Sequence, residues 1–310
     1  MKKLSFIVPC YNEEKNIALF YNEVLENFKN IKYKIELVFI NDGSKDNTIN
    51  ELKKLVDTKK FIIKVINFSK NFGKESGIYA GLKTCTGDYA VIIDCDMQQP
   101  PKLVLDMLKV IEKDPDIDIV TYYQEKRIEG KFISFCKKSF YKLIDKLTQM
   151  KFVNAASDFR LLNRKSIDAI LSLSEHNRFS KGIFTWIGFN NYYLPYTPEE
   201  RQYGQTSWSF KQLVNYALTG ILSFVKNPLR ILFSFGFINL LSSIIWFVIL
   251  LILSKPLNNI SYIYPFILFL FGINLFVLGY IGEFIGKSYE EVKNRPIYII
   301  KDIYTNEKDN

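Results

Sequence analysis

Asp94 and Asp96 stand one residue apart, directly after the apolar run from Tyr89 to Ile93. The run is rich in β-branched residues, which predicts a buried strand with both carboxylates at its C-terminal end. Ligands of open α/β sheets bind at this end of the strands. Two hard oxygen ligands, with the amide oxygen of Gln98 close by, can hold a divalent cation against a diphosphate. A polar turn after a strand would have the same spacing, so the pair alone leaves both interpretations open.

Strand and helix patterns alternate through the first half of the chain. Apolar runs predict strands at Leu4–Val8, Ile35–Ile40, Phe61–Phe68 and Tyr89–Ile93. Helical patterns follow the first three strands and end near Phe28, Asp57 and Lys83. This alternation predicts an α/β fold with a mostly parallel sheet covered by helices. The first strand is not followed by G-x-G-x-x-G, which disfavours a nicotinamide-binding domain.

Two long segments of the second half carry no charged residue, one from Ile231 to Ser254 and the other from Pro256 to Gly282. Each is longer than the ~20 apolar residues needed to span a bilayer core. Buried core helices would be shorter and would carry polar residues, so the pattern favours a membrane hairpin. Ahead of it, Thr206 to Lys226 mixes aromatic and basic residues, which predicts a helix at the headgroup level.

Basic residues flank the predicted hairpin on one side of the membrane. Lys226 and Arg230 precede it, and Lys287 and Arg295 follow it, whereas the connection between its helices holds only Lys255. The positive-inside rule therefore places both ends in the cytoplasm. The first apolar run is too short for an export signal, which agrees with this orientation. We expect a multi-pass protein of the cell (inner) membrane whose N-terminal domain is cytoplasmic.

Charge and composition disfavour several classes of function. The net charge is +9, but the basic residues are dispersed and no nucleic-acid recognition motif is present. We therefore expect no nucleic acid as partner, and attribute the charge to anionic lipid and phosphorylated substrates. The four cysteines lack C-x-x-C spacing, which indicates reduced thiols. His176 is the sole histidine, which disfavours histidine metal sites and Ser-His-Asp catalysis.

Motifs in a fixed order carry a resemblance to a known family. They are Val8–Glu14, Asn41–Asp46, Asn71–Glu75, Ala80–Gly81, Asp94–Pro101, Ser157–Leu161, Arg178–Gly182, Trp186–Gly188 and Arg201–Ser207. With them the chain resembles the family-2 glycosyltransferases of the GT-A fold, and among these the polyprenyl-phosphate glycosyltransferases. The resemblance covers essentially the whole chain. It implies a Rossmann-like, mostly parallel GT-A catalytic domain over residues 1–205, an interfacial amphipathic region over 206–228, two transmembrane helices in 229–286, and a cytoplasmic tail with a short strand in 287–310.

The resemblance also assigns roles to individual side chains. The donor-binding residues would be Pro9, Tyr11, Asn12, Glu13, Asp42, Lys74 and Asp94. A Mg²⁺ or Mn²⁺ ion, held by Asp94, Asp96 and Gln98, would neutralise charge as a nucleotide diphosphate leaves. The acceptor phosphate would meet Arg127, Arg160, Arg178, Lys181 and Arg201, because cationic side chains and above all guanidinium groups bind phosphate. Asp158 and Asp96 would be the catalytic residues.

Two of these assignments have alternatives. Asp158 stands where the family has a catalytic base, but a lipid monophosphate is already ionised near neutral pH, with a second pKa around 6. Asp158 can therefore orient the acceptor, stabilise charge at the sugar, or pair with Arg160 to hold a loop. Asp42 follows the second predicted strand, where an aspartate can bind a uracil or ribose or act as an ordinary helix cap.

The implied reaction is an inverting transfer of a hexose from a UDP-sugar to undecaprenyl phosphate. Glucose is the first expectation for the sugar, and N-acetylglucosamine is the second. The product would be a lipid-phosphate-linked sugar for cell-envelope glycan modification. Two alternatives are a membrane polysaccharide synthase, for which two helices make a poor pore, and an inactive membrane scaffold, against which Asp94, Asp96 and Asp158 argue.

Small residues in both apolar segments, among them Gly236 and Gly272, permit close contact between helices. The run Ile297–Ile300 predicts a short strand that pairs with its own catalytic domain or with a neighbour's. We expect a homo-oligomer, and the resemblance implies a tetramer.

Overall fold

The computed structural model describes residues 1–124, 156–176, 178–197 and 263–307, and also the single positions 242, 245 and 248. Within these residues eight strands form one sheet, in the order β7-β5-β6-β4-β1-β2-β3-β8. The strands are β1 (Lys3–Cys10), β2 (Lys34–Asn41), β3 (Ile62–Phe68), β4 (Tyr89–Ile92), β5 (Ile119–Gln124), β6 (Ala156–Asn163), β7 (Asn191–Tyr196) and β8 (Ile300–Thr305). The helices are α1 (Ile17–Phe28), α2 (Thr48–Val56), α3 (Lys74–Thr84), α4 (Val104–Lys113), α6 (Arg164–Leu171), α7 (Ser180–Trp186) and α10 (Ile263–Val292).

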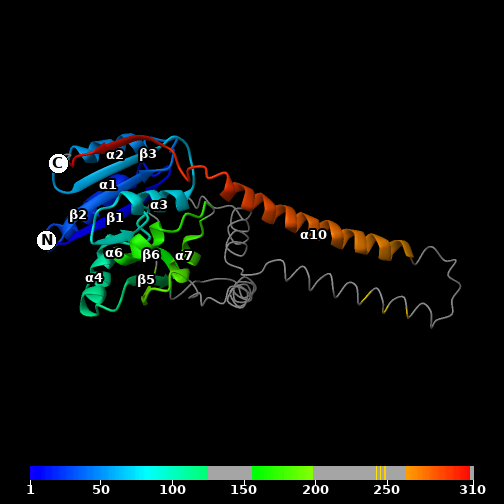
Figure 1. Cartoon of the computed structure of the whole chain (residues 1–310). Coiled ribbons are helices and arrows are strands. Elements are labelled where there is room, and N and C mark those ends of the chain that lie inside the picture. The colour runs from blue at the N-terminus through cyan, green and yellow to red at the C-terminus, as the bar shows by residue number, and fades with distance from the viewer. Residues whose placement is uncertain are drawn as a thin grey trace.

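The centre of the sheet is made of four parallel strands, β4, β1, β2 and β3. These strands are apolar on both faces, as expected where helices cover both sides. In β1, Phe6 packs edge-on against Phe28 of α1 with ring centroids 5.1 Å apart, whereas Ile7 packs in the opposite layer with Ile78 of α3. The sheet is thus a middle layer, with α1, α2 and α4 on one side and α3, α6 and α7 on the other (Figure 1).

The prediction of a mostly parallel sheet holds for the central strands and needs correction at β6 and β8, because the sheet is mixed. β6 runs antiparallel to β4 and β5, and β8 runs antiparallel to β3. The sequence pattern does not reveal β6, because Ser157, Asp158 and Arg160 interrupt its apolar residues. Ile92 of β4 lies opposite Arg160 of β6, and the same register continued beyond the strand end brings Asp94 opposite Asp158. The antiparallel strand therefore joins two motifs that are far apart in the sequence.

The C-terminal tail completes the sheet. β8 pairs with β3 of the same chain, and Asn67 Nδ2 donates to Asp302 Oδ2 at 3.0 Å. The sequence predicts this strand at Ile297–Ile300, but it starts at Ile300, because Tyr298 first stacks its ring on Phe68 with centroids 4.9 Å apart. A segment outside the predicted domain of residues 1–205 thus belongs to its sheet.

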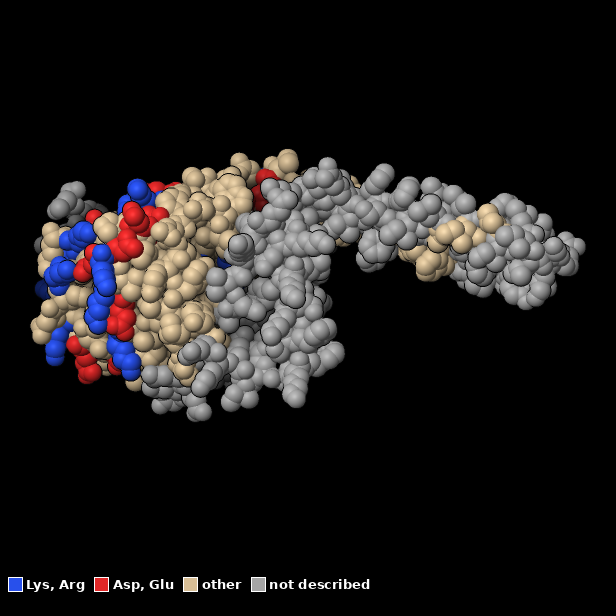
Figure 2. Space-filling model, turned by 90° about the horizontal axis from the view of Figure 1, so that it is seen from below, with Lys and Arg blue, Asp and Glu red and all other residues tan. Residues whose placement is uncertain are grey.

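The helix α10 has 30 residues and projects away from the sheet (Figure 1). Its stretch Phe269–Val292 is long and apolar enough to cross a membrane, by length and composition, and Phe271 and Leu278 within it are exposed. It is the one helix of this kind in the part of the chain that the structure describes. On the face shown in Figure 2, charged side chains gather at the end of the domain remote from α10.

Several predictions for the second half of the chain concern residues outside those that the structure describes. Of the first predicted span, only Ser242, Ile245 and Val248 are described, and all three are helical. The interfacial region at 206–228 lies outside the described residues. Both remain predictions.

Candidate active site

The loop after β4 carries the two aspartates identified from the sequence. Asp96 is buried, and its Oδ1 accepts from the backbone N–H of Gln98 at 3.1 Å. Met97 between them has a φ of 62°, a left-handed conformation that non-glycine residues rarely adopt and that clusters at functional sites. Pro100 and Pro101 then begin a short 3₁₀ turn. The loop therefore ends the strand abruptly and leaves Asp94 just beyond the C-terminal end of β4.

Lys74, the first residue of α3, lies between two of the predicted carboxylates. Its Nζ is 2.8 Å from Asp94 Oδ2 and 3.3 Å from Asp158 Oδ2. The three side chains keep between 27% and 30% of their surface exposed, so a substrate can reach them. Burial alone would lower the pKa of Lys74, but the two carboxylates outweigh it and raise that pKa above its usual range.

Asp158 is held ionised by its neighbours. Burial alone would raise its pKa, but the positive charges of Lys74, Lys181 and Arg160 outweigh burial and hold the pKa well below its ordinary value. A carboxylate in that state is a poor proton acceptor, because an efficient general base has a pKa near the working pH. Its Oδ1 is buried and has no hydrogen-bond partner among the described residues. The arrangement thus suits a carboxylate that orients a ligand or stabilises positive charge.

Asp42 has a different environment from the one that the sequence suggests. Its Oδ1 accepts from the backbone N–H of Phe72 at 2.6 Å, and its Oδ2 accepts from that of Gly73 at 2.9 Å. Burial raises the pKa of Asp42 to about 6, although these two hydrogen bonds oppose the shift. The carboxylate therefore holds the loop that leads into Lys74, and it does not cap α2, the helix that follows it.

The neighbouring glycine makes this contact possible. Gly43 has a φ of +63°, and a Cβ atom there would lie 2.4 Å from the backbone carbonyl carbon of Lys70. Only glycine fits such a close approach between two backbones. The Asn-Asp-Gly turn thus brings the loop after β3 against the end of β2.

The predicted donor loop after β1 is tied to the loop after β2. The N–H of Asn12 donates to Ser44 Oγ at 3.0 Å, and Asn12 Oδ1 accepts from the N–H of Lys45 at 2.8 Å. The N–H of Glu13 donates to Thr48 Oγ1 at 2.8 Å. The structure therefore brings the predicted donor residues of both loops to one end of the sheet, while their contact with a nucleoside remains a prediction.

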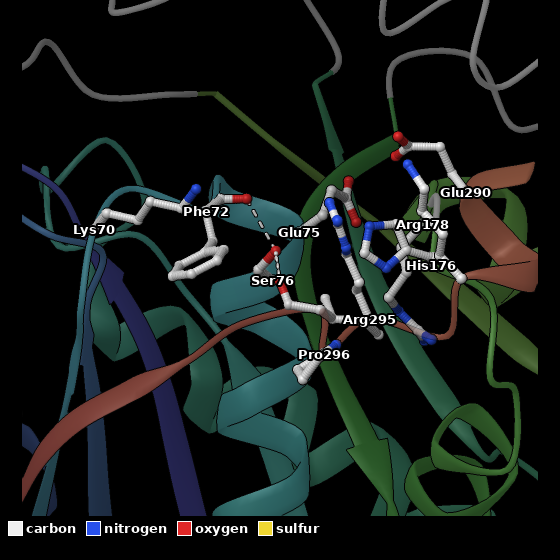
Figure 3. Close-up of a pocket in the computed structure, with 11 residues that line it drawn as sticks. Lys70, Phe72, Glu75, Ser76, His176, Arg178, Glu290, Arg295 and Pro296 are labelled. Carbon is white, nitrogen blue, oxygen red and sulfur yellow. Dashed lines mark hydrogen bonds between the residues drawn. The ribbon is translucent and has the colours of Figure 1, made fainter. Parts of the chain in front are cut away.

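The predicted acceptor-phosphate residues do not all meet. Arg160 is buried, with its guanidinium 4.3 Å from the ring centroid of Phe184, and both Arg160 and Lys181 of α7 are close enough to lower the pKa of Asp158. Arg178 instead donates to the carbonyl oxygens of Ile170 and Leu173 and lines a separate pocket (Figure 3). Arg127 and Arg201 lie outside the described residues.

Glu75 is a functional candidate that the sequence analysis did not single out. Its carboxylate accepts from the backbone N–H of Ser180 at 3.0 Å and also from the Ser180 hydroxyl. This contact joins the first turns of α3 and α7, which carry Lys74 and Lys181. Glu75 stands in the motif Asn71–Glu75, but nothing in its spacing points to Ser180, which is more than a hundred residues away.

The donor atoms of the Asp94–Asp96 loop suit a hard divalent cation. Cys95 between them is buried, and its contact with Cys10 together with burial raises the pKa of the thiol well above its ordinary value, so it offers no thiolate. No group of three or more His, Cys, Asp or Glu that could hold a metal occurs among the described residues. Mg²⁺ typically takes one or two carboxylates and completes its shell with substrate phosphates. The carboxylates of Asp94 and Asp96 fit such a shared site.

Comparison with known proteins gives the class of this protein. The model of the Glycosyl transferase family 2 matches residues 5–171. The protein CsbB of Bacillus subtilis (strain 168), which carries a glycosyltransferase name, is 40% identical over 311 residues, covering 99% of this chain and 93% of that protein. The SfII prophage-derived bactoprenol glucosyl transferase of Shigella flexneri is 36% identical over 304 residues, covering 96% of this chain and 97% of that protein.

Solved structures agree with the fold. Glucosyl-3-phosphoglycerate synthase from Mycobacterium tuberculosis, in complex with Mn²⁺, UDP and phosphoglyceric acid, superposes with a TM-score of 0.50 at 15% identity, covering 73% of this chain and 80% of that one. The chain belongs to glycosyl transferase family 2, has a GT-A-like mixed α/β fold, and is a glycosyltransferase.

Proposed function

We propose that this glycosyltransferase moves a hexose from a UDP-sugar to a polyprenyl phosphate, undecaprenyl phosphate in particular, on the cytoplasmic leaflet of the cell membrane. Glucose is the sugar we favour, with N-acetylglucosamine as the alternative. The observation that carries the proposal is the position of Lys74, which touches both Asp94 and Asp158. Asp94, on the predicted metal side, and Asp158, on the predicted acceptor side, would therefore both lie within reach of one bound sugar. The bactoprenol glucosyl transferase relative supports the acceptor class, because the match covers almost the whole of both chains.

The donor side would work through charge. Asp94, Asp96 and Gln98 would hold Mg²⁺ or Mn²⁺, which when bound neutralises the negative charge that develops on the departing UDP. The ammonium group of Lys74 lies 2.8 Å from Asp94 and would add a second positive charge beside the diphosphate. Stabilisation of this kind is commonly the largest single contribution to catalysis in group transfer.

The acceptor side needs little proton transfer. The phosphate oxygen of the lipid is already ionised, so it attacks the anomeric carbon directly while the bond to UDP breaks and UDP leaves with the electron pair. Attack from the face opposite to UDP inverts the anomeric configuration. Asp158, kept ionised by Lys74, would stabilise positive charge on the sugar, and Lys181 and Arg160 would attract the acceptor phosphate.

The membrane placement rests on the long apolar segments. The exposed apolar surface of α10 supports a spanning role, and its C-terminal end returns to the catalytic domain through β8. The lipid product would serve cell-envelope glycan modification. The intact cluster of Lys74, Asp94 and Asp158 argues against an inactive scaffold.

Membranes containing the protein should be incubated with undecaprenyl phosphate and a panel of radiolabelled UDP-sugars, and the labelled lipid should be identified. Transfer of label to a lipid monophosphate in the presence of Mg²⁺ or Mn²⁺ is the expected result, with UDP-glucose the best donor. Membranes carrying Asp96→Asn are the matched control. Label that appears in a polymer, or none above this control with any UDP-sugar, would overturn the proposal.

A further inference from the structure

A second pocket lies where α10 meets the catalytic domain, and the transfer reaction leaves it without a role. It has a volume of about 410 Å³. Its walls come from the loop after β3 and the first turn of α3, from residues 176 and 178, and from the end of α10 with the segment that follows it (Figure 3). Three parts of the chain that are distant in sequence therefore converge on one cavity.

Most of the polar groups around this pocket are already paired. Glu75 accepts from Ser180, and the carboxylate of Glu291 accepts from the backbone N–H of His176 through both oxygens, at 3.0 and 2.9 Å. The guanidinium of Arg178 is taken up by two backbone carbonyls and lies 4.4 Å from the ring centroid of Tyr79. These contacts build the walls of the pocket.

Three positively charged side chains in the pocket have no carboxylate partner among the described residues. Lys70, Lys293 and Arg295 line it, and none of them forms an ion pair with a carboxylate among the described residues. Lys70 lies over the ring of Phe72, and Lys293 lies over the ring of Tyr289, which keeps both side chains at the rim. The carboxylates in the lining are Glu75, which accepts from Ser180, and Glu290. The excess of positive charge points to an anionic ligand.

The position of the pocket indicates where that anion comes from. Lys293 follows directly on Val292, the last residue of the candidate span Phe269–Val292. The uncharged part of α10 ends at Gly282, and the turns beyond it combine charged residues with the exposed apolar side chains of Ile285, Tyr289 and Val292. A helix end that combines charged and exposed apolar residues is suited to the headgroup level of a membrane. Basic groups immediately beyond a membrane helix attract anionic headgroups.

We propose that this pocket binds the phosphate of an anionic phospholipid, as a site separate from the one that carries out transfer. The proposal goes beyond the transfer reaction and does not depend on it. The two sites share the first turn of α3: Lys74 turns to Asp94 and Asp158, whereas Glu75 and Ser76 line the pocket. A bound phosphate would draw the Lys70 loop and the end of α10 together around that turn.

The test is lipid binding to the purified full-length protein in neutral detergent, without donor or acceptor, measured by native mass spectrometry. Wild-type protein should bind phosphatidylglycerol in preference to phosphatidylcholine. The double variant Lys293→Gln/Arg295→Gln should bind phosphatidylglycerol roughly 10- to 30-fold more weakly, because each cation near the surface contributes on the order of 1 kcal/mol. Lys70→Gln, on the opposite wall, should weaken binding in the same direction. The charge-matched control is Lys59→Gln/Lys60→Gln, two exposed lysines before β3, which should bind like the wild type.

Competing sources of the anion give different results. Equal phosphatidylglycerol binding by the pocket variant and the control would overturn the proposal. So would displacement of the lipid by millimolar inorganic phosphate, which would indicate a soluble anion. In a parallel measurement with undecaprenyl phosphate in place of phosphatidylglycerol, a variant that keeps phosphatidylglycerol but loses undecaprenyl phosphate would overturn the proposal and assign the pocket to the acceptor. A melting temperature of the variant equal to that of the control shows that a loss of binding is not a loss of folding.

Discussion

Asp158 is the residue whose role depends most on its surroundings. With Lys74 at 3.3 Å and further positive charge from Lys181 and Arg160, its pKa lies far below neutral pH. A base would have to hold a proton during turnover, and this carboxylate holds one poorly. We therefore assign it the stabilisation of charge on the acceptor side of the sugar.

Asp158→Asn should reduce turnover by at least 100-fold, because it removes the negative charge without changing the shape. UDP binding should change less than threefold, since we assign the residue to the acceptor side. Turnover with saturating UDP-sugar and calorimetric titration with UDP plus Mn²⁺ give the two numbers. Equal losses in both would show that Asp158 only supports the structure.

Asp42 predicts a pH dependence of stability. Burial raises its pKa from 3.8 to about 6, so the folded protein holds this proton more tightly than the unfolded chain does. The stabilisation from the proton is complete below about pH 4 and is lost as the pH rises through 6. Compared with Asp42→Asn, which does not titrate, the wild type should therefore lose stability between pH 4 and pH 7, by up to about 3 kcal/mol. Melting temperatures of both proteins across this range provide the test, and a difference that is constant or grows with pH would contradict the assignment.

At the scale of elements, the tail from Pro296 to Thr305 holds the edge of the sheet. Tyr298 stacks on Phe68 with an interplanar angle of 16°, and the N–H of Ser69 donates to the carbonyl of Ile299 at 3.0 Å. The same segment passes α3, where Ser76 Oγ lies 3.4 Å from the carbonyl oxygen of Ile297. The tail thus fixes the far side of the helix that begins with Lys74.

Tyr298→Ala should destabilise the catalytic domain by about 1–2 kcal/mol, because a half-buried ring loses its stacking and apolar contacts. Tyr298→Phe keeps the ring and should melt within a degree or two of the wild type. Limited proteolysis with trypsin should cut the alanine variant faster at Lys293 and Lys301, on either side of the ring. If the alanine and phenylalanine variants behave alike, the stacking is not what anchors the tail.

The sequence patterns predicted some elements well and others poorly, for physical reasons. β1 to β4 are buried on both faces, so their apolar runs are easy to recognise. The pattern of β6 is not, because Ser157, Asp158 and Arg160 interrupt its apolar residues. The motifs contain Lys74, Asp94 and Asp158, but their mutual contact depends on the antiparallel register of β4 and β6, which no local pattern encodes. Arg178 shows the opposite case. A loop arginine suggests phosphate binding, yet here the guanidinium is used by two backbone carbonyls.

At the scale of the whole molecule, the outer edge of β8 has no strand beside it among the residues that the structure describes. Ile299, Ile300 and Ile303 lie in or next to this strand, and their side chains are between 38% and 56% exposed. An exposed apolar edge strand is unusual, because its unpaired backbone groups invite pairing with another chain. The small residues of the apolar segments would add a second surface for self-association. We therefore expect a homo-oligomer, with a tetramer as the expected size.

Light scattering of the protein in detergent, with the micelle subtracted, should give about four times the chain mass of 36.3 kDa. Ile303→Lys should lower the measured mass, because it places a charge on the outer edge, while Lys301→Gln on the same strand should leave it unchanged. An active species of a single chain mass at working concentration would rule out the assembly.

The most direct test of the account is the product made by purified protein from UDP-glucose and undecaprenyl phosphate with Mn²⁺. Mass spectrometry should find undecaprenyl phosphate carrying one hexose, and NMR should find the β configuration at its anomeric carbon, opposite to that of the donor. Chelation of the metal and the Asp96→Asn variant should each reduce this product by at least 100-fold. Free glucose as the main product, retention of configuration, or full activity without a divalent cation would contradict the account.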